Sequence, residues 1–275
     1  MKKTKIILDT DIGSDIDDAY ALVFALNSPE IQIKAIITNN SNVEKKAQIV
    51  RAFTKEIPIF KGIEINKGFL TTTIGDPYYK TESFQDNLDF FNDKDIIYVS
   101  IGALSNLAYF LDKGIKFKKV VIMGGSINLD YKGRRNTVLE WNLNSDLNAT
   151  KKVFNSDLNI LLVTLDSTWN LELNEKQIEM IRKNNKPTPI LLTKHLDEMR
   201  DFLLKRFNIH FKKPVLHDPL SVYASFGDDF FSLEEINLKI SDNGLLYPEK
   251  KGKKMKVVTN SKREFIDFFM NRILK

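Results

Sequence analysis

Five aspartates lie close together near the amino terminus, and their type and spacing suit them to chemistry. They are Asp9, Asp11, Asp15, Asp17 and Asp18. A short apolar run, Lys5–Leu8, precedes them, and a helical apolar pattern begins at Ala19. A helix amino terminus favours one or two acidic groups, but five repel one another unless a cation neutralises them. Hard carboxylate oxygens select calcium or magnesium over zinc, so this segment predicts a divalent-cation site.

Two other interpretations of the acidic segment fit less well. An acidic cap on a surface helix accounts for one or two aspartates, but not for a strand that directs all five toward its end. An EF-hand places ligands at alternate positions between two helices and closes with a glutamate. In this sequence a strand pattern comes first and no glutamate closes the loop.

Short apolar strands alternate with amphipathic helices along the chain, which predicts an α/β fold around an open, mainly parallel sheet. The expected strands are Lys5–Leu8, Ile33–Ile37, Ile96–Ser100, Val120–Met123 and Ile160–Thr164. Ligands of such sheets bind beyond the carboxyl ends of the strands, so the loops after these strands are the expected location of the chemistry. Neither an internal repeat nor a long linker divides residues 1–275, and we expect a single domain.

The segments between and after these strands complete the expected organisation. A helix is expected near Glu44–Lys55, and Gly68–Asp93 has no clear period and is expected to be a long loop. A proline-bounded loop is expected to carry His217-Asp218, and the β-rich end of the chain closes with a helix at about Arg263–Leu274.

The composition limits the class of protein. Apolar residues make up 43% of the 275 residues and charged residues 28%, enough for a sizeable core. Without cysteine, a disulfide framework, a thiolate metal site and a cysteine nucleophile are excluded, which fits a reducing cytoplasm. No apolar run suggests a signal peptide or a membrane span, so a soluble protein is expected. The net charge of +5 owes much to lysines around Gly252, which we interpret as a solvated loop, because no aromatic residue interleaves with them as nucleic-acid binding would need.

Several motifs resemble those of the inosine–uridine-preferring nucleoside hydrolase family. In the family's order they are the loop Asp9–Asp18, Ser41-Asn42, Ile101 to Ala108, Val121 to Gly125, Glu140-Trp141-Asn142 followed by Asp146, and His217-Asp218. Each motif is weak alone, but six in the right order make coincidence unlikely. The resemblance covers nearly the whole chain and implies an open α/β sheet of Rossmann-like character.

The resemblance also implies a set of site residues. One calcium ion would be held by Asp11, Asp18, Asp218 and the backbone carbonyl of Ile101, and Asp17 would be the general base. The ribose hydroxyls would be bound by Asn42, Glu140 and Asn142, with Asn128 or Asn136 as a further ribose contact. The substrate would be a small nucleoside, with no nucleic-acid or membrane partner, and family members are usually dimers or tetramers.

The acidic loop departs from the family's pattern in its length. It is two residues longer, because Asp15-Ile16 precedes Asp17-Asp18. We align on the Asp-Asp pair at the helix start, which leaves open whether Asp15 takes over one of the roles. The segment between Gly125 and Glu140 is also longer than in the family.

The expected reaction is calcium-dependent hydrolysis of the N-glycosidic bond of a ribonucleoside or a related N-riboside, which releases ribose and a nucleobase. The bond breaks through a cation-like ribose, and a metal lowers the pKa of a water that attacks it. Asp17 can accept the proton of this water. His217 either donates a proton to the leaving base or orients Asp218. For His195 and His210 a structural role is expected.

Two rival functions remain. A phosphatase of the haloacid dehalogenase type also begins with a strand and Asp-x-Asp, but it needs Thr or Val where Gly13 stands and has no use for the acidic run up to Asp18. A protein that binds calcium and a nucleoside without turnover would have no need of a general base, so the presence of Asp17 argues against it.

Overall fold

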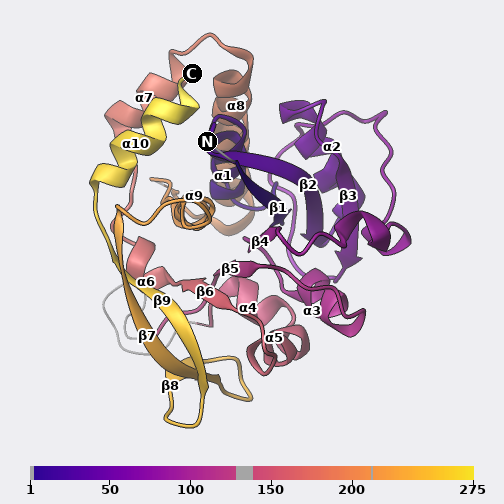
Figure 1. Cartoon of the computed structure of the whole chain (residues 1–275). Coiled ribbons are helices and arrows are strands. Elements are labelled where there is room, and N and C mark those ends of the chain that lie inside the picture. The colour runs from indigo at the N-terminus through magenta and orange to yellow at the C-terminus, as the bar shows by residue number, and fades with distance from the viewer. Residues whose placement is uncertain (1–2, 128–138, 212) are drawn as a thin grey trace.

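Within the described residues 3–127, 139–211 and 213–275 of the computed structural model, nine strands form one sheet (Figure 1). In the order in which they lie side by side, the strands are β3 (Ile59–Glu64), β2 (Ile31–Asn40), β1 (Thr4–Thr10), β4 (Ile97–Ser100), β5 (Lys119–Met123), β6 (Ile160–Val163), β9 (Lys253–Ser261), β7 (Phe231–Ile240) and β8 (Leu246–Pro248). The seven strands from β3 to β9 in this order are parallel, and β7 and β8 are antiparallel to their neighbours. The expected open, mainly parallel α/β sheet is therefore confirmed.

The strand order places a crevice at the centre of the sheet. The chain builds outward from β1 through β2 to β3, and then returns to the other side of β1 with β4. The connections that leave the carboxyl ends of β1 and β4 therefore run in opposite directions, and ligands of open α/β sheets bind at such a point. The acidic segment follows β1, and Ile101 follows β4.

Helices cover both faces of the sheet (Figure 1). The longer ones are α1 (Asp17–Leu26), α2 (Val43–Phe53), α3 (Ser105–Asp112), α5 (Leu147–Phe154), α7 (Glu175–Arg182), α8 (Pro187–Phe207), α9 (His217–Tyr223) and α10 (Glu264–Ile273). Short helical turns are η1 (Phe84–Asp86), η2 (Leu88–Phe91), α4 (Trp141–Ser145) and α6 (Leu165–Thr168). In β1, Ile6 and Leu8 pack into one apolar cluster and Ile7 into the other. A strand buried on both faces reads as a continuous apolar run, which is why β1 is visible in the sequence.

Three segments differ from the sequence-based expectation. His217 and Asp218 open helix α9 rather than lying in a loop. Strand β3 was not expected, and β9 begins at Lys253, inside the lysine-rich segment that was interpreted as a loop. The long loop at Gly68–Asp93 is confirmed apart from the two short turns η1 and η2.

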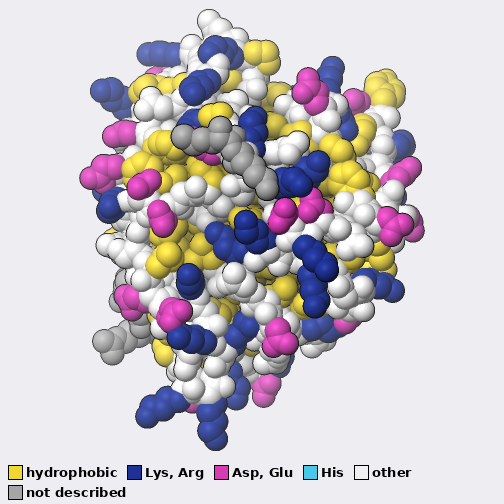
Figure 2. All heavy atoms as spheres, in the orientation of Figure 1, with side chains coloured by type: hydrophobic (Ala, Val, Ile, Leu, Met, Phe, Trp, Pro, Cys, Tyr) yellow, Lys and Arg dark blue, Asp and Glu magenta, His cyan; other side chains and the backbone are white. Residues whose placement is uncertain are grey.

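Basic and acidic side chains are intermixed on the face of the molecule shown in Figure 2. Among the described residues, none of the helices has the length and apolar character needed to cross a membrane.

Candidate active site

A cavity of about 430 Å³ opens at the carboxyl ends of the strands. Residues at or just beyond the ends of β1, β4, β5 and β6 line it, namely Asp11, Ile101, Met123 and Leu165. Acidic side chains of the lining come from the β1–α1 loop, α1, α9 and Glu140, and apolar ones are contributed by Phe69, Leu139, Trp141, Met199 and Leu203. Ser14, Asn142 and His217 also line the cavity. The cavity thus presents both charged oxygen atoms and flat apolar surface.

Three buried carboxylates form the core of the acidic lining. One oxygen from each of Asp17, Asp18 and Asp218 lies within 4.8 Å of the others. The first two open helix α1 and the third lies in the first turn of α9, and these two helices pack against each other. Burial, followed by the charge of neighbouring carboxylates, raises the pKa of all three groups well above the ordinary value. The cluster is therefore electrostatically incomplete without a cation.

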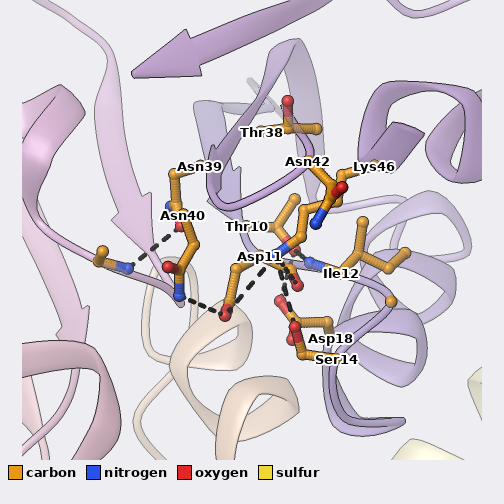
Figure 3. Close-up of polar contacts among 12 residues, drawn as sticks. Thr10, Asp11, Ile12, Ser14, Asp18, Thr38, Asn39, Asn40, Asn42 and Lys46 are labelled. Carbon is orange, nitrogen blue, oxygen red and sulfur yellow. Dashed lines mark hydrogen bonds and ion pairs between the residues drawn. The ribbon is translucent and has the colours of Figure 1, made fainter. Parts of the chain in front are cut away.

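Asp11 approaches the cluster from the end of β1, and its surroundings fix its orientation (Figure 3). The side-chain amide of Asn40 donates to Asp11 Oδ2 at 3.1 Å. The ammonium of Lys46 lies 4.0 Å from the same oxygen and donates to the backbone carbonyl of Asp11 at 2.9 Å. Both partners are completely buried, so Asp11 is held at its side chain and at its backbone.

Thr10 fixes the second aspartate of the pair in α1. Its hydroxyl donates to Asp18 Oδ1 at 2.5 Å and accepts from the backbone N–H of Ile12 at 3.1 Å. The end of β1 therefore orients the first turn of α1 through a side chain. Asp15, by contrast, is exposed and lines the cavity, and its carboxylate accepts from the backbone of Ile16 at 2.6 Å.

Asp9 does not line the cavity, and its carboxylate accepts hydrogen bonds from three uncharged donors. Its Oδ2 accepts from the Tyr98 hydroxyl at 2.5 Å, and its Oδ1 from the side-chain amides of Asn39 at 2.7 Å and Asn106 at 2.9 Å. Burial raises the pKa of Asp9 to about 7, although these donors act in the opposite direction. The Asp9 carbonyl accepts from the N–H of Ile101 at 2.8 Å, which joins the ends of β1 and β4.

His217 precedes Asp218 and is buried beside α6. Its Nδ1 lies 2.6 Å from the hydroxyl of Thr168. Burial lowers the pKa of His217 to about 4, so the imidazole is neutral at pH 7.

Glu140 and Asn142 are fixed by the start of helix α4. The Glu140 carboxylate caps this helix by accepting from the N–H groups of Asn142 at 2.8 Å and Leu143 at 3.0 Å, and it also accepts from Gly125 N–H at 3.0 Å. The Asn142 amide donates to the carbonyl of Met123 at 3.2 Å. These bonds join the end of β5, with its Met-Gly-Gly motif, to the start of α4, with its Glu-x-Asn motif.

A comparison with known protein families identifies the family of the chain. Residues 6–266 match the family described as inosine-uridine preferring nucleoside hydrolase. The chain belongs to this family. The resemblance and the N-ribosyl hydrolase activity inferred from the motifs are thereby confirmed.

Curated relatives of this nucleoside hydrolase are distant but similar over most of their length. A probable uridine nucleosidase 2 from Oryza sativa is 24% identical over 273 residues, which cover 88% of this chain and 79% of that protein. The pyrimidine-specific ribonucleoside hydrolase RihA of Salmonella schwarzengrund is 25% identical over 260 residues, covering 84% and 82%.

Solved structures share the fold of this nucleoside hydrolase. A purine-preferring ribonucleoside hydrolase from Gardnerella vaginalis has a TM-score of 0.82 and 24% identity, with 98% of both chains covered. An inosine-uridine preferring nucleoside hydrolase from Bacillus anthracis has a TM-score of 0.76 and 18% identity, with 100% of this chain and 99% of that chain covered.

The structure brings together most of the residues expected at the site. Those that line the one cavity are Asp11, Asp17, Asp18, Ile101, Glu140, Asn142, His217 and Asp218. Asn42 does not line it, because this residue is exposed and precedes helix α2 in a left-handed conformation with φ 56°. Asn128 and Asn136 lie outside the described residues. The individual roles of these residues stay predictions.

Asn40, Lys46 and Phe69 are among the contributors to the site that sequence reasoning missed. Asn40 and Lys46 contact Asp11, and Phe69 lines the cavity. The polar run at the end of β2 was a usable signal for Asn40, since residues at strand ends were already the expected location of the chemistry. The sequence offers no comparable signal for Lys46, which is one lysine among others in an amphipathic helix pattern.

The donor set of this nucleoside hydrolase fits a hard divalent cation. Calcium binds oxygen at about 2.3–2.6 Å, so two of its ligands lie no more than about 5 Å apart. The spacing of 4.8 Å within the cluster satisfies this limit for Asp18 and Asp218, the two of its members that are expected ligands, and Asp11 and Ile101 line the same cavity. The raised pKa of each carboxyl group shows that ionisation needs a compensating positive charge, which such an ion supplies.

Proposed function

We propose that this nucleoside hydrolase cleaves ribonucleosides with the help of a calcium ion bound by Asp11, Asp18, Asp218 and the carbonyl of Ile101. The observation that carries the proposal is the convergence of carboxylates from α1 and α9 in one cavity, although about 200 residues separate them in the sequence. Calcium, rather than magnesium, suits the several protein oxygens offered, because magnesium keeps more of its water ligands.

Asp17 is the proposed general base. Bound in the cluster, calcium would lower the pKa of a water molecule and orient it. Asp17 lies within the same 4.8 Å spacing as Asp18 and Asp218, close enough to accept a proton from that water. The surrounding carboxylates also stabilise the positive charge that develops on the ribose as the bond to the base breaks.

Glu140 and Asn142 are proposed to bind the ribose hydroxyls. The Oε1 atom of Glu140 accepts one backbone hydrogen bond, and a carboxylate oxygen has capacity for a second, from a hydroxyl donor. We assign the role first given to Asn42 to Asn40 instead, because Asn40 is the amide that reaches Asp11, and its buried Oδ1 has no hydrogen-bond partner in the described parts of the chain.

The base is proposed to lie against the apolar lining formed by Phe69, Trp141 and Met199. Aromatic and thioether side chains suit the flat face of either a purine or a pyrimidine. The names of the relatives differ in the class of base, since one is named pyrimidine-specific and another purine-preferring. His217 is neutral at pH 7, which favours a role in orienting Asp218 over proton donation from an imidazolium.

Metal titration combined with substitutions in the cluster tests the proposal. Asp18→Asn and Asp218→Asn are expected to weaken calcium affinity at least 100-fold (roughly 2.7 kcal/mol), because each removes a charged ligand, measured by isothermal titration calorimetry on chelator-treated protein. Asp17→Asn is expected to keep calcium affinity within about threefold but to lower kcat for inosine and uridine by 10²-fold or more. The matched control is Asp157→Asn, an exposed aspartate that precedes β6 at the opposite end of that strand.

The outcomes separate the rival functions. Calcium and nucleoside binding without release of ribose would identify a binding protein. Loss of calcium affinity in Asp17→Asn would make Asp17 a ligand rather than the base, and unchanged affinity in the other two variants would refute the metal site.

The proposal also includes a dimeric or tetrameric assembly and a single domain over residues 1–275. It includes a cytoplasmic location, which the lack of cysteine supports. It further includes the absence of nucleic-acid or membrane partners, which the mixed charge on the face shown in Figure 2 supports.

A further inference from the structure

Lys46 is a completely buried lysine directly beneath the acidic loop. It lies in helix α2, and its ammonium reaches the loop between β1 and α1 (Figure 3). The ammonium donates to the Asp11 carbonyl at 2.9 Å and to the Ser14 hydroxyl at 3.4 Å, and it lies 4.0 Å from Asp11 Oδ2. Two of the three N–H donors of this ammonium group are used by the Asp11 carbonyl and the Ser14 hydroxyl, and the Asp11 carboxylate lies at ion-pair distance. A buried charge is retained only where such partners compensate for the loss of water.

The contacts of Lys46 fall on the first part of the acidic loop, from Asp11 to Ser14, directly before the two extra residues Asp15-Ile16. Gly13, with φ +97°, lies between the two residues that Lys46 binds, so the backbone turns there. Ser14 also donates to the carbonyl of Phe69 at 3.1 Å, which links the same loop to the apolar lining of the cavity. A longer loop has more conformations to lose when it binds an ion, and a fixed partner from a rigid helix reduces that loss.

We propose that Lys46 is a positioning residue that holds the lengthened acidic loop, and with it Asp11, in the geometry required to bind the metal. The inference rests on the proposed calcium site. Lys46 does not line the cavity; it acts through the backbone and the carboxylate of Asp11.

Removal of Lys46 changes calcium affinity in opposite directions, depending on whether its hydrogen bonds or its positive charge matters more. A fixed positive charge near a bound cation repels it, so loss of the charge alone would tighten calcium binding. Loss of the hydrogen bonds instead frees the Asp11 carbonyl and the Ser14 hydroxyl, and the loop no longer presents Asp11 in one orientation. The sign of the change in affinity therefore distinguishes the two effects.

The test compares calcium affinity in the wild-type protein with that in Lys46→Met, which keeps an unbranched side chain without charge or donors. Isothermal titration calorimetry of chelator-treated protein with calcium chloride is expected to show at least tenfold weaker binding. Lys46→Gln, which restores an N–H donor but no charge, is expected to recover part of the affinity. Lys45→Met, the neighbouring partly exposed lysine of the same helix, is the matched control and is expected to bind as the wild type does.

A kinetic readout separates positioning from a general loss of structure. In Lys46→Met the calcium concentration that gives half-maximal activity is expected to rise at least tenfold, while kcat at saturating calcium stays within about threefold of wild type. If Lys46→Met does not fold, as judged by the absence of a cooperative thermal transition, Lys46→Gln carries the comparison. Equal or tighter calcium binding by the folded variant overturns the role of Lys46 and leaves the metal site intact. Absence of calcium binding by the wild-type protein overturns both.

Discussion

At the scale of single residues, His195 shows how a buried ionisable group couples stability to pH. Its side chain in α8 is completely buried, and neither ring nitrogen has a hydrogen-bond partner in the described parts of the chain. Burial lowers the pKa of His195 to about 4, from an ordinary value of 6.5. The imidazole therefore fills the core as a neutral ring, in keeping with the structural role expected for it.

The free energy of unfolding is expected to fall as the pH drops from 6.5 toward 4, because the unfolded chain binds a proton at His195 before the folded chain does. Between pH 7 and pH 5 this one group is expected to remove on the order of 2 kcal/mol. His195→Leu should lack that part of the pH dependence in urea unfolding at the two pH values. His210→Leu, an exposed histidine, should keep it. An unchanged pH dependence in His195→Leu would contradict the assignment.

The sequence predicts the aspartates of the site better than its amides. Five carboxylates in one short segment predict a cation site without knowledge of the fold. The choice between Asn40 and Asn42 depends instead on backbone geometry, since both have positive φ, 72° and 56°, and only the first side chain turns toward Asp11. A residue pattern does not encode that difference.

At the scale of elements, the long loop that begins at Gly68 is fastened to helix α8 by one carboxylate. Glu198 accepts from the Thr72 hydroxyl at 2.5 Å, from Thr73 N–H at 2.7 Å and from the Thr73 hydroxyl at 2.6 Å. Thr71 in turn donates from its N–H to the Gly13 carbonyl at 2.8 Å. The loop is thus held on one side by α8 and on the other by the acidic segment, with Phe69 at the cavity.

Glu198→Gln is expected to loosen this loop, because an amide supplies one acceptor oxygen in place of two. Since Phe69 is proposed to contact the base, the KM for inosine and uridine is expected to rise about tenfold, or about 1.4 kcal/mol, with a smaller change in kcat. Steady-state kinetics at saturating calcium measure the effect. Asp201→Asn on the same helix removes only an exposed ion pair with Lys205 and should leave KM unchanged. A drop in kcat alone would contradict a role in binding the base.

Two elements show where pattern reasoning fails. The segment around His217 was expected to be a loop because prolines bound it, yet Pro219 lies in the first turn of α9. The N–H groups of a first turn have no acceptor within the helix, so a proline, which lacks an N–H, is tolerated there. Strand β3 lies at the sheet edge, where it pairs with one neighbouring strand, and its sequence contains Gly62 and a lysine. Neither pattern stands out without the surrounding fold.

At the scale of the whole molecule, the acidic cluster is expected to couple cation binding to the free energy of unfolding. Burial, followed by the charge of neighbouring carboxylates, raises the pKa of Asp17, Asp18 and Asp218, so their ionised forms are unfavourable in the folded chain, where α1 and α9 pack together. A cation that binds only the folded state stabilises it by mass action.

Calcium at 100 times its dissociation constant is expected to stabilise the protein by about 2.7 kcal/mol and to raise Tm by roughly 5–10 °C. Differential scanning calorimetry with calcium or chelator measures this shift. Asp218→Asn should raise Tm of the chelated protein, because it removes a buried ionisable group beside two other carboxylates, and should abolish the shift. A Tm that does not respond to calcium in the wild-type protein would contradict the linkage.

The overall architecture was predictable because alternation of strand and helix patterns constrains a parallel sheet to few arrangements, and those arrangements gather strand ends at one edge. The apolar lining of the cavity was not. It depends on how Phe69, in a loop without periodicity, packs on Phe202 of α8 with ring centroids 5.2 Å apart. Such a contact follows from tertiary packing alone.

The ion-binding cluster draws its members from opposite ends of the polypeptide, with Asp17 and Asp18 in α1 and Asp218 in α9. During synthesis, Asp17 and Asp18 emerge long before Asp218, so the three carboxylates come together only after about four fifths of the 275 residues have been made. Given the proposed calcium site, a fragment that ends before α9 should neither take up calcium nor turn over a nucleoside.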